Sequence, residues 1–206
     1  MVIRTHSAYV PMGFWTLALF VFLTAPPGRA ETREAFVAGV GIPEQTLLAG
    51  ERLILNGAGL RRFLGLQVYV AALYLPETQR SAEDVLAREV PKRLQLTWLR
   101  DVSAERNIDA LMAGFRANHS AAEMRALSAE IAQCIDLLRA LNQVKAGAVI
   151  NLDYRPGLGT QLSTASHILG TIPGEHFNRA LLKIWLGEAP TQISLKRALL
   201  GLERPS

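Results

Sequence analysis

The segment "NGAGLRRFLGLQVYVAALYLP", residues 56–76, places two adjacent arginines between glycines and a strongly apolar run. Gly57 and Gly59 can adopt backbone conformations closed to other residues, so they predict a turn just before Arg61. The run after Arg62 is rich in β-branched and aromatic residues and is apolar in both alternations, which predicts a central strand covered on both faces. The segment therefore predicts a sheet whose buried strand begins beside two cations.

Only one of these two arginines can face the interior, because neighbouring side chains of a strand point to opposite faces. An arginine in a partly desolvated cleft needs an anion, and its planar guanidinium suits a carboxylate or an enolate. The alternative is that Arg61 and Arg62 are both solvated at the start of the strand. The residues of this segment leave the two interpretations open.

Residues 1–30 have the pattern of a secretory signal peptide. A basic start precedes the apolar stretch "MGFWTLALFVFLTA", and Gly28 and Ala30 stand at the −3 and −1 positions of a cut before Glu31. A membrane-spanning helix needs about 20 apolar residues, and this stretch is shorter. We expect cleavage after Ala30, which leaves residues 31–206 as a periplasmic or secreted domain. An uncleaved N-terminal membrane anchor is the alternative.

The 206-residue chain is long enough for one domain with a sizeable core, since half of its residues are hydrophobic. Its 22 basic and 18 acidic side chains give a net charge of +4. Removal of the signal segment deletes Arg4 and Arg29, so 20 basic and 18 acidic side chains remain, with a net charge of +2. We expect no nucleic-acid partner, because no basic patch remains. Membrane contact is expected only through an uncleaved signal segment.

The order of the remaining patterns predicts an α+β fold. Short strands punctuated by glycine and proline come first, and helical periodicity then predicts helices over residues 103–118, 121–142 and 175–186, with a β-hairpin in "GAVINLDYRPGLGTQLS" before the third. Phe177 and Trp185 fall on the apolar stripe of the third helix, so we expect both to be buried. Strands and helices in blocks, without strand–helix alternation, indicate helices packed on one face of a largely antiparallel sheet.

Several kinds of chemical site are not indicated by the sequence. The "GLG" motif at residues 157–159 lacks a third glycine and lies between strands, so a dinucleotide site is not expected. His119, His167 and His176 lack metal-ligand spacing, and we expect neither a metal nor a cofactor. Cys134 is the single cysteine and falls at the edge of a helical apolar stripe, so we expect a buried free thiol, not a nucleophile.

Five segments in order resemble the chalcone isomerase-like proteins of bacteria: "NGAGLR", "VYVAALYLP", "LRDVSAER", "GAVINLDYRPGLGTQLS" and "FNRALLKIWLGEAPTQISLKRALLG". The similarity extends over residues 36–201. It implies the chalcone isomerase fold, an open-faced β-sandwich with a large antiparallel sheet, a helical layer and a ligand cleft between them. This agrees with the α+β pattern predicted from the residues alone.

The resemblance also implies candidate site residues. Family members that isomerise chalcones use an arginine to hold the nucleophilic phenolate, aided by threonine, tyrosine and asparagine side chains. Related members place the same arginine on the carboxylate of a fatty acid. The arginine corresponds to Arg61 and the threonine to Tyr69, whereas the tyrosine falls near Asn107 and the asparagine near Gly114. The anion-binding arginine is therefore kept and its three partners are replaced, and Arg62 is expected to be solvated.

We therefore predict a non-catalytic protein that binds a small amphipathic anion such as a fatty acid. Arg61 is expected to hold the carboxylate, Tyr69, Tyr74 and Trp98 to form the walls, and Asn107 to be a further ligand contact. The first alternative is an isomerase of the intramolecular-lyase (chalcone–flavanone) type, with Arg61 as its one catalytic candidate. The second is an interaction protein without a ligand. The sequence identifies neither the ligand nor the protein partners and oligomeric state.

Overall fold

A seven-stranded antiparallel sheet forms the centre of the domain. The computed structural model describes residues 1–2 and 33–203, so the predicted signal peptide, apart from its first two residues, lies outside the described residues. The strand order is β11-β10-β9-β6-β5-β4-β3, and each neighbouring pair is antiparallel. The strands are β3 (Gln45–Leu48), β4 (Glu51–Phe63), β5 (Leu66–Leu75), β6 (Lys92–Trp98), β9 (Val149–Arg155), β10 (Gly159–Thr164) and β11 (Ile168–Ile172).

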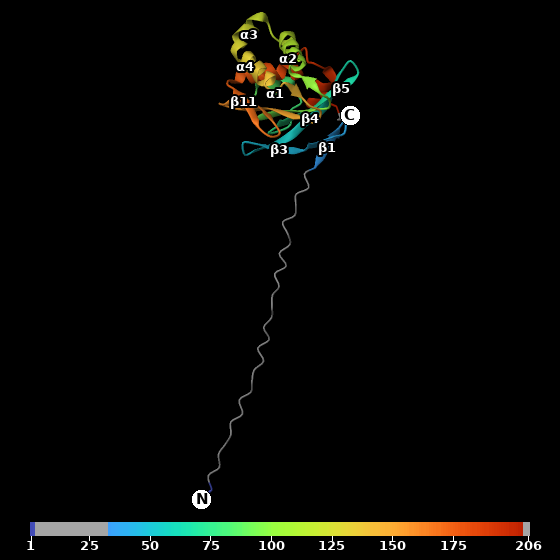
Figure 1. The fold of residues 1–206 in the computed structure, drawn as a ribbon. Helices are drawn as coiled ribbons and strands as arrows, with labels where there is room; N and C mark the ends of the chain where they lie inside the picture. The colour runs from blue at the N-terminus through green and yellow to red at the C-terminus, as the bar shows by residue number, and fades with distance from the viewer. Residues whose placement is uncertain (3–32, 204–206) are drawn as a thin grey trace. The chain divides into compact units, whose positions relative to one another are not determined.

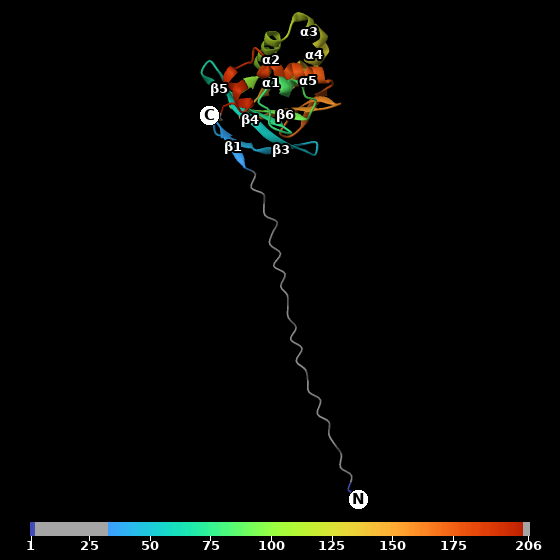
Figure 2. The same cartoon turned by 180° about the vertical axis from the view of Figure 1, so that it is seen from behind.

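Helices cover one face of this sheet and a short hairpin lies on the other, as the two opposite views show (Figures 1 and 2). A two-stranded pair, β7 (Val102–Ser103) with β8 (Gln143–Val144), joins segments of the helical layer. None of the described helices is long and apolar enough to cross a membrane. The hairpin is β1 (Glu34–Val37) with β2 (Val40–Pro43), and the helices are α1 (Ala82–Ala87), α2 (Ala104–Asn118), α3 (Ala121–Ala126), α4 (Ser128–Arg139), α5 (Glu175–Leu186) and α6 (Ile193–Leu199).

Strand β5 is buried on both faces, as its two-sided apolar pattern predicts. Tyr69 and Leu73 belong to the large core under the helices. Val70 and Tyr74 belong to a smaller core under β1 and β2. The strand therefore separates two cores, and the parity of a residue's position decides which core its side chain enters.

Gly57 and Gly59 do not form the predicted turn, because they lie within the long strand β4. A Cβ atom on Gly57 would lie 2.1 Å from the Ala198 carbonyl oxygen, and one on Gly59 would lie 2.7 Å from the Ala198 Cβ. These glycines therefore allow helix α6 to pack directly on the strand backbone. The prediction of a turn here is wrong, because the glycines serve close packing and not a special backbone conformation.

Helices α1 and α3 each begin after a serine N-cap. The Ser81 side chain accepts a hydrogen bond from the Asp84 N–H at the start of α1, and Ser120 with Glu123 forms a complete capping box at α3. The prediction of one continuous helix over residues 121–142 is wrong. The structure has two helices there, α3 and α4, which are separated at Leu127, and α4 ends at Arg139. No proline or glycine marks this break.

The other two predicted helices are confirmed within a residue. Helix α2 begins one residue after the predicted start, because Ser103 is its N-cap and accepts from the Arg106 N–H. Helix α5 spans the predicted residues. Phe177 and Trp185 are both buried, as predicted from the apolar stripe. The α+β prediction is therefore confirmed by the layers of the structure.

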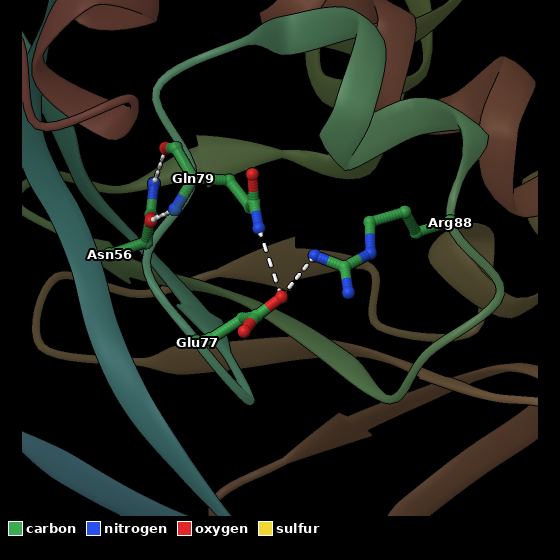
Figure 3. Close-up of polar contacts among 4 residues, drawn as sticks. All are labelled: Asn56, Glu77, Gln79 and Arg88. Atoms are coloured by element: carbon green, nitrogen blue, oxygen red, sulfur yellow. Dashed lines mark hydrogen bonds and ion pairs between the residues drawn. The ribbon is translucent and has the colours of Figure 1, made fainter.

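Asn56 ties three segments together at a bulge of β4 (Figure 3). Its Nδ2 donates to the Leu199 carbonyl oxygen at 2.7 Å and to the Gln79 carbonyl oxygen at 2.9 Å, and its Oδ1 accepts from the Gln79 N–H at 2.6 Å. The Gln79 side chain in turn donates to Glu77, which forms an ion pair with Arg88. The bulge thus fixes the end of α6 and the loop after β5 against the sheet.

Candidate functional site

A cavity of about 850 Å³ lies between the sheet and the helices, and it is amphipathic. Buried apolar side chains form its deep wall. The charged side chains that line it are exposed or half-buried, which places them at its opening. The deep wall includes Leu96, Ile150, Leu152 and Leu162 from the strands and Leu111, Leu138, Leu181 and Ile184 from the helices. The charged residues at the opening are Arg61, Arg100, Asp101, Arg106 and Asp109.

Arg61 lines this cavity and Arg62 does not, which is the distribution that strand alternation predicts. Arg61 is half-buried near the end of β4, on the same side as Gly59, and pairs across the sheet with Tyr69. Arg62 is exposed. Among the residues that the structure describes, Arg61 has no carboxylate partner. The cavity therefore opens beside a cation whose charge is not neutralised by an ion pair in the described part of the chain.

Gln192, which precedes helix α6, positions Arg61. Its Oε1 accepts from the Arg61 Nη1 at 3.3 Å and from the Arg62 backbone N–H at 2.8 Å, while its Nε2 donates to the Leu60 carbonyl oxygen at 3.1 Å. The Arg61 Nη1 also donates to the Arg62 carbonyl oxygen. The hydrogen bonds of Arg61 to Gln192 and to the Arg62 backbone both use Nη1, and the guanidinium also lies within hydrogen-bonding reach of the Tyr69 hydroxyl. A planar anion can approach the Nε and Nη2 edge, which an arginine can use for two parallel hydrogen bonds.

Tyr69 provides a second polar group at this end of the cavity. Its hydroxyl accepts a hydrogen bond from Trp185 Nε1 at 2.9 Å. Burial raises the pKa of Tyr69, and the hydrogen bond from Trp185, the positive charge of Arg61 and a hydrogen bond with Arg61 oppose that shift without reversing it. The hydroxyl therefore stays protonated at neutral pH. Since the indole already occupies it as an acceptor, its own proton is available to donate to an anion.

Trp98 lines the same cavity, and its indole N–H is buried without a hydrogen-bond partner among the described residues. The ring packs edge-on against Tyr69, with centroids 5.2 Å apart. A buried donor without a partner costs about 1–3 kcal/mol, so a polar atom of a ligand or a water molecule at this wall would be stabilising. Trp98 is thus both an apolar wall and a candidate donor.

The remaining predicted site residues divide between the two faces of the sheet. Asn107 on α2 is half-buried and lines the cavity, near Gly114 on the same helix. Tyr74 does not line it: this side chain is fully buried in the core under β1 and β2. The prediction of Tyr74 as a cavity wall is therefore corrected. Five positions separate it from Tyr69, and an odd spacing places two residues of one strand on opposite faces.

Cys134 also lines the cavity, as part of its apolar wall. The side chain is buried, and burial raises the pKa of the thiol to about 12. The thiolate is the nucleophilic form of cysteine, and it is therefore scarce here at neutral pH. The prediction of a buried free thiol is confirmed.

Sequence reasoning missed Trp185 and Gln192 as parts of the site. The helical stripe correctly predicts that Trp185 is buried, but periodicity does not reveal that its indole reaches Tyr69, 116 positions earlier. Gln192 lies 131 positions after Arg61 and carries no local motif. Gln192 immediately precedes α6, the helix that packs on the glycines of β4. This position would indicate a contact with Arg61 only to a reader who already knew the fold.

The comparisons with known proteins agree with this architecture. Among solved structures, a fatty-acid binding protein of Arabidopsis thaliana is similar, with 14% sequence identity and a TM-score of 0.59 over 79% of this chain and 92% of that chain. At this identity the likeness shows the fold alone. A comparison with curated protein sequences found no match. The model of the chalcone isomerase-like family matches residues 34–201. Because this match covers most of the sequence, the chain belongs to the chalcone isomerase-like family.

Proposed function

We propose that this protein binds a fatty acid or a similar amphipathic anion and does not transform it. The observation that carries the proposal is the position of Arg61, a cation without an ion pair in the described part of the chain, at the opening of a cavity with an apolar interior. The cavity volume of about 850 Å³ lies within the range of about 300–1,000 Å³ that is usual for small-molecule sites. The similar plant structure is that of a fatty-acid binding protein, which supports the same role.

The proposed ligand lies with its carboxylate at Arg61 and its tail between the sheet and the helices. The Nε and Nη2 edge of Arg61 donates two parallel hydrogen bonds to the carboxylate, and the Tyr69 hydroxyl donates a third. The tail replaces water along the leucine and isoleucine side chains of the deep wall, which contributes about 25 cal/mol for each Å² of apolar surface removed from water. Both ends of an amphiphile therefore find a matching environment.

Binding fits the site better than isomerisation does, because the positions that would assist a reaction hold other groups. The position that the resemblance matches to the family's threonine holds Tyr69, a larger side chain whose ring packs against Trp98. A Cβ atom on Gly114 would lie 2.6 Å from Ile184 Cγ2, so an asparagine at this position could enter only if Ile184 moved. The site therefore combines the positioned charge of Arg61 with a large apolar volume, which suffices to hold an amphipathic anion.

We also propose that the protein is exported, with the mature chain beginning at Glu31. The basic start, the apolar stretch and the small residues Gly28 and Ala30 support this proposal. N-terminal sequencing of the protein from fractionated cells of its own host should find Glu31, within a residue or two, in the periplasm or the medium. Finding Met1 on protein retained in the cytoplasm would contradict export.

The binding proposal is tested with the protein purified from its own compartment. Native mass spectrometry with lipid extraction should detect a co-purifying acid, and calorimetric titration of delipidated protein should give saturable binding of a long-chain fatty acid. The methyl ester of the same acid is the matched control, because it keeps the tail and removes the charge. Equal affinity for acid and ester, or no binding of either, contradicts the proposal. Turnover of chalcones by ligand-free protein would favour the isomerase instead.

A further inference from the structure

The hairpin that joins β4 and β5 ends in an exposed apolar tip beside the opening of the cavity. We define the hairpin tip as residues 63–66, Phe63-Leu64-Gly65-Leu66. Phe63 is 57% exposed, Leu64 85% and Leu66 51%, and all three also border the cavity. The hairpin projects from the edge of the domain beside the label of β5 (Figures 1 and 2). Large apolar side chains are thus held in water at the point where a ligand would enter.

The turn itself does not explain the leucine at position 64. Leu64 and Gly65 have φ angles of +48° and +78°, and tight hairpin turns with two positive φ angles favour asparagine or aspartate followed by glycine. A leucine in the left-handed region costs about 1 kcal/mol or more. A leucine at position 64 therefore strains the backbone and exposes an apolar side chain to water. Neither effect stabilises the free protein, so an interaction with another molecule must account for this residue.

The surroundings of the hairpin tip carry an excess of positive charge. The cavity that the hairpin tip borders is lined by three arginines and two aspartates, a fourth arginine, Arg62, adjoins the tip in the chain, and one of the aspartates, Asp101, is paired with Lys145 at 2.9 Å. A further apolar side chain, Ile193, is 70% exposed and follows Gln192, which binds the Arg62 backbone. An apolar projection beside a cavity opening with more arginines than aspartates matches a lipid surface with negative headgroups. The charged residues are Arg61, Arg62, Arg100, Arg106, Asp101 and Asp109.

We propose that the hairpin tip inserts into the surface of a phospholipid bilayer that contains anionic lipids, and that ligand exchanges between the bilayer and the cavity at this contact. The exchange step rests on the proposed binding function, whereas the docking does not. A second copy of the chain fits the hairpin tip less well. A specific protein interface buries about 1,200–2,000 Å² of well-fitted surface, and a projecting four-residue turn offers little of this. A bilayer requires no complementary shape.

An environment-sensitive label at the hairpin tip tests the docking. The full-length Leu64→Cys variant can be labelled selectively with nitrobenzoxadiazole, because the native Cys134 is buried. The control is Leu158→Cys, which places the label at another exposed hairpin turn, 43% exposed. The strand register puts the two turns at opposite ends of the sheet, since Trp98 pairs with Tyr69 near the hairpin tip whereas the β9–β10 turn follows the far end of β9. Both variants share residues 1–32, so an N-terminal anchor affects them equally.

The expected result is a blue shift and a rise in emission of the position-64 label when phosphatidylcholine vesicles containing phosphatidylglycerol are added without fatty acid. The position-158 label should not change, and vesicles of phosphatidylcholine alone should give a weaker signal. No change at position 64, or equal changes at both positions, overturns the proposal. A change at position 64 that follows protein concentration without vesicles also overturns it, because that result indicates self-association.

Two substitutions without a label separate the apolar and the charged contributions. Leu64→Asn suits the turn conformation and removes the apolar side chain, so vesicle partitioning should fall roughly ten- to hundredfold while the protein stays folded. Arg62→Gln should lower partitioning about fivefold on anionic vesicles and little on neutral ones. Partitioning unaffected by Leu64→Asn contradicts the proposal. Because docking is measured without ligand, wild-type protein that docks but binds no fatty acid refutes only the binding function, and the reverse result refutes only the docking.

Discussion

Replacing Arg61 with alanine tests the proposed anion site directly. The substitution removes the guanidinium edge that would pair with a carboxylate and leaves the apolar wall of the cavity unchanged. A hydrogen bond to a charged group contributes about 1.5–3 kcal/mol, so the affinity for a long-chain fatty acid should fall roughly ten- to hundredfold. The affinity for the methyl ester should change little. The tail keeps its contacts, so weak binding of the acid should remain.

The stability of this variant should not fall with its affinity. In the described part of the chain, Arg61 makes no ion pair, and its contacts are hydrogen bonds of Nη1 to Gln192 and Arg62 together with a stacking contact on Phe63. An unpaired cation beside an apolar cavity is costly when no ligand is bound. We therefore expect the melting temperature of ligand-free Arg61→Ala to be unchanged or raised, whereas the increase caused by ligand should shrink.

Isothermal titration calorimetry of matched variants measures the effect. Arg61→Lys should recover only part of the affinity, since an ammonium group cannot reproduce the two parallel hydrogen bonds of a guanidinium. Arg62→Ala should bind like wild type, because its side chain is exposed and does not line the cavity. Equal affinities of wild type and Arg61→Ala would remove Arg61 from the site. A larger loss in Arg62→Ala would show that the anion lies on the outer face of the strand.

Three further predictions follow from the packing and the charges. Tyr69→Phe should lower fatty-acid affinity about two- to tenfold and lower stability by about 1–3 kcal/mol, because a buried indole loses its acceptor; a loss of stability with unchanged affinity would exclude the hydroxyl as a ligand contact. Gly57→Ala should lower the free energy of unfolding by about 1–3 kcal/mol in urea titrations, because the new methyl group displaces α6. The control Gly41→Ala meets no backbone atom, only the flexible Glu34 carboxylate at 2.7 Å and the Phe36 ring at 3.5 Å, and equal effects would refute the packing argument. Burial lowers the pKa of Lys92 from its usual 10.5 to about 8, so between these values the unfolded state binds more protons and stability rises with pH. Lys92→Met should abolish that rise and be more stable at pH 7, and identical pH profiles of the two proteins would refute the assignment.

Local patterns in the sequence predict much of the fold, because they report on each element's own surroundings. The two-sided apolar run of β5 predicts a strand between two layers, and the apolar stripe of α5 predicts its buried face. Helical periodicity predicts the starts of α2 and α3 within a residue, and a serine N-cap stands before each of them in the structure. Strand alternation separates Arg61 from Arg62. These signals depend only on the geometry of a single helix or strand.

Two predictions, the cavity wall at Tyr74 and the turn at Gly57 and Gly59, failed for different physical reasons. The same alternation that separates the arginines also separates Tyr69 from Tyr74, so the sequence already contained the information that only one of the tyrosines shares a face with Arg61. The glycines of β4 are a different case. A glycine signals either a special backbone conformation or close packing, and only the position of α6 shows that Gly57 has the second role.

The residue patterns alone therefore predict the α+β class and the buried strand, and they allow only one of the two arginines to face inward, whereas it is the resemblance to the family that selects Arg61. Only the folded chain shows what surrounds Arg61: Gln192 accepts from its Nη1, Trp185 donates to the hydroxyl of its cross-strand neighbour Tyr69, and three helices (α2, α4 and α5) and the sheet enclose the cavity. More than a hundred positions separate these partners along the chain. Local periodicity fixes which face of an element is apolar, whereas the contacts between distant faces depend on the shapes that pack together, and those shapes exist only in the folded chain.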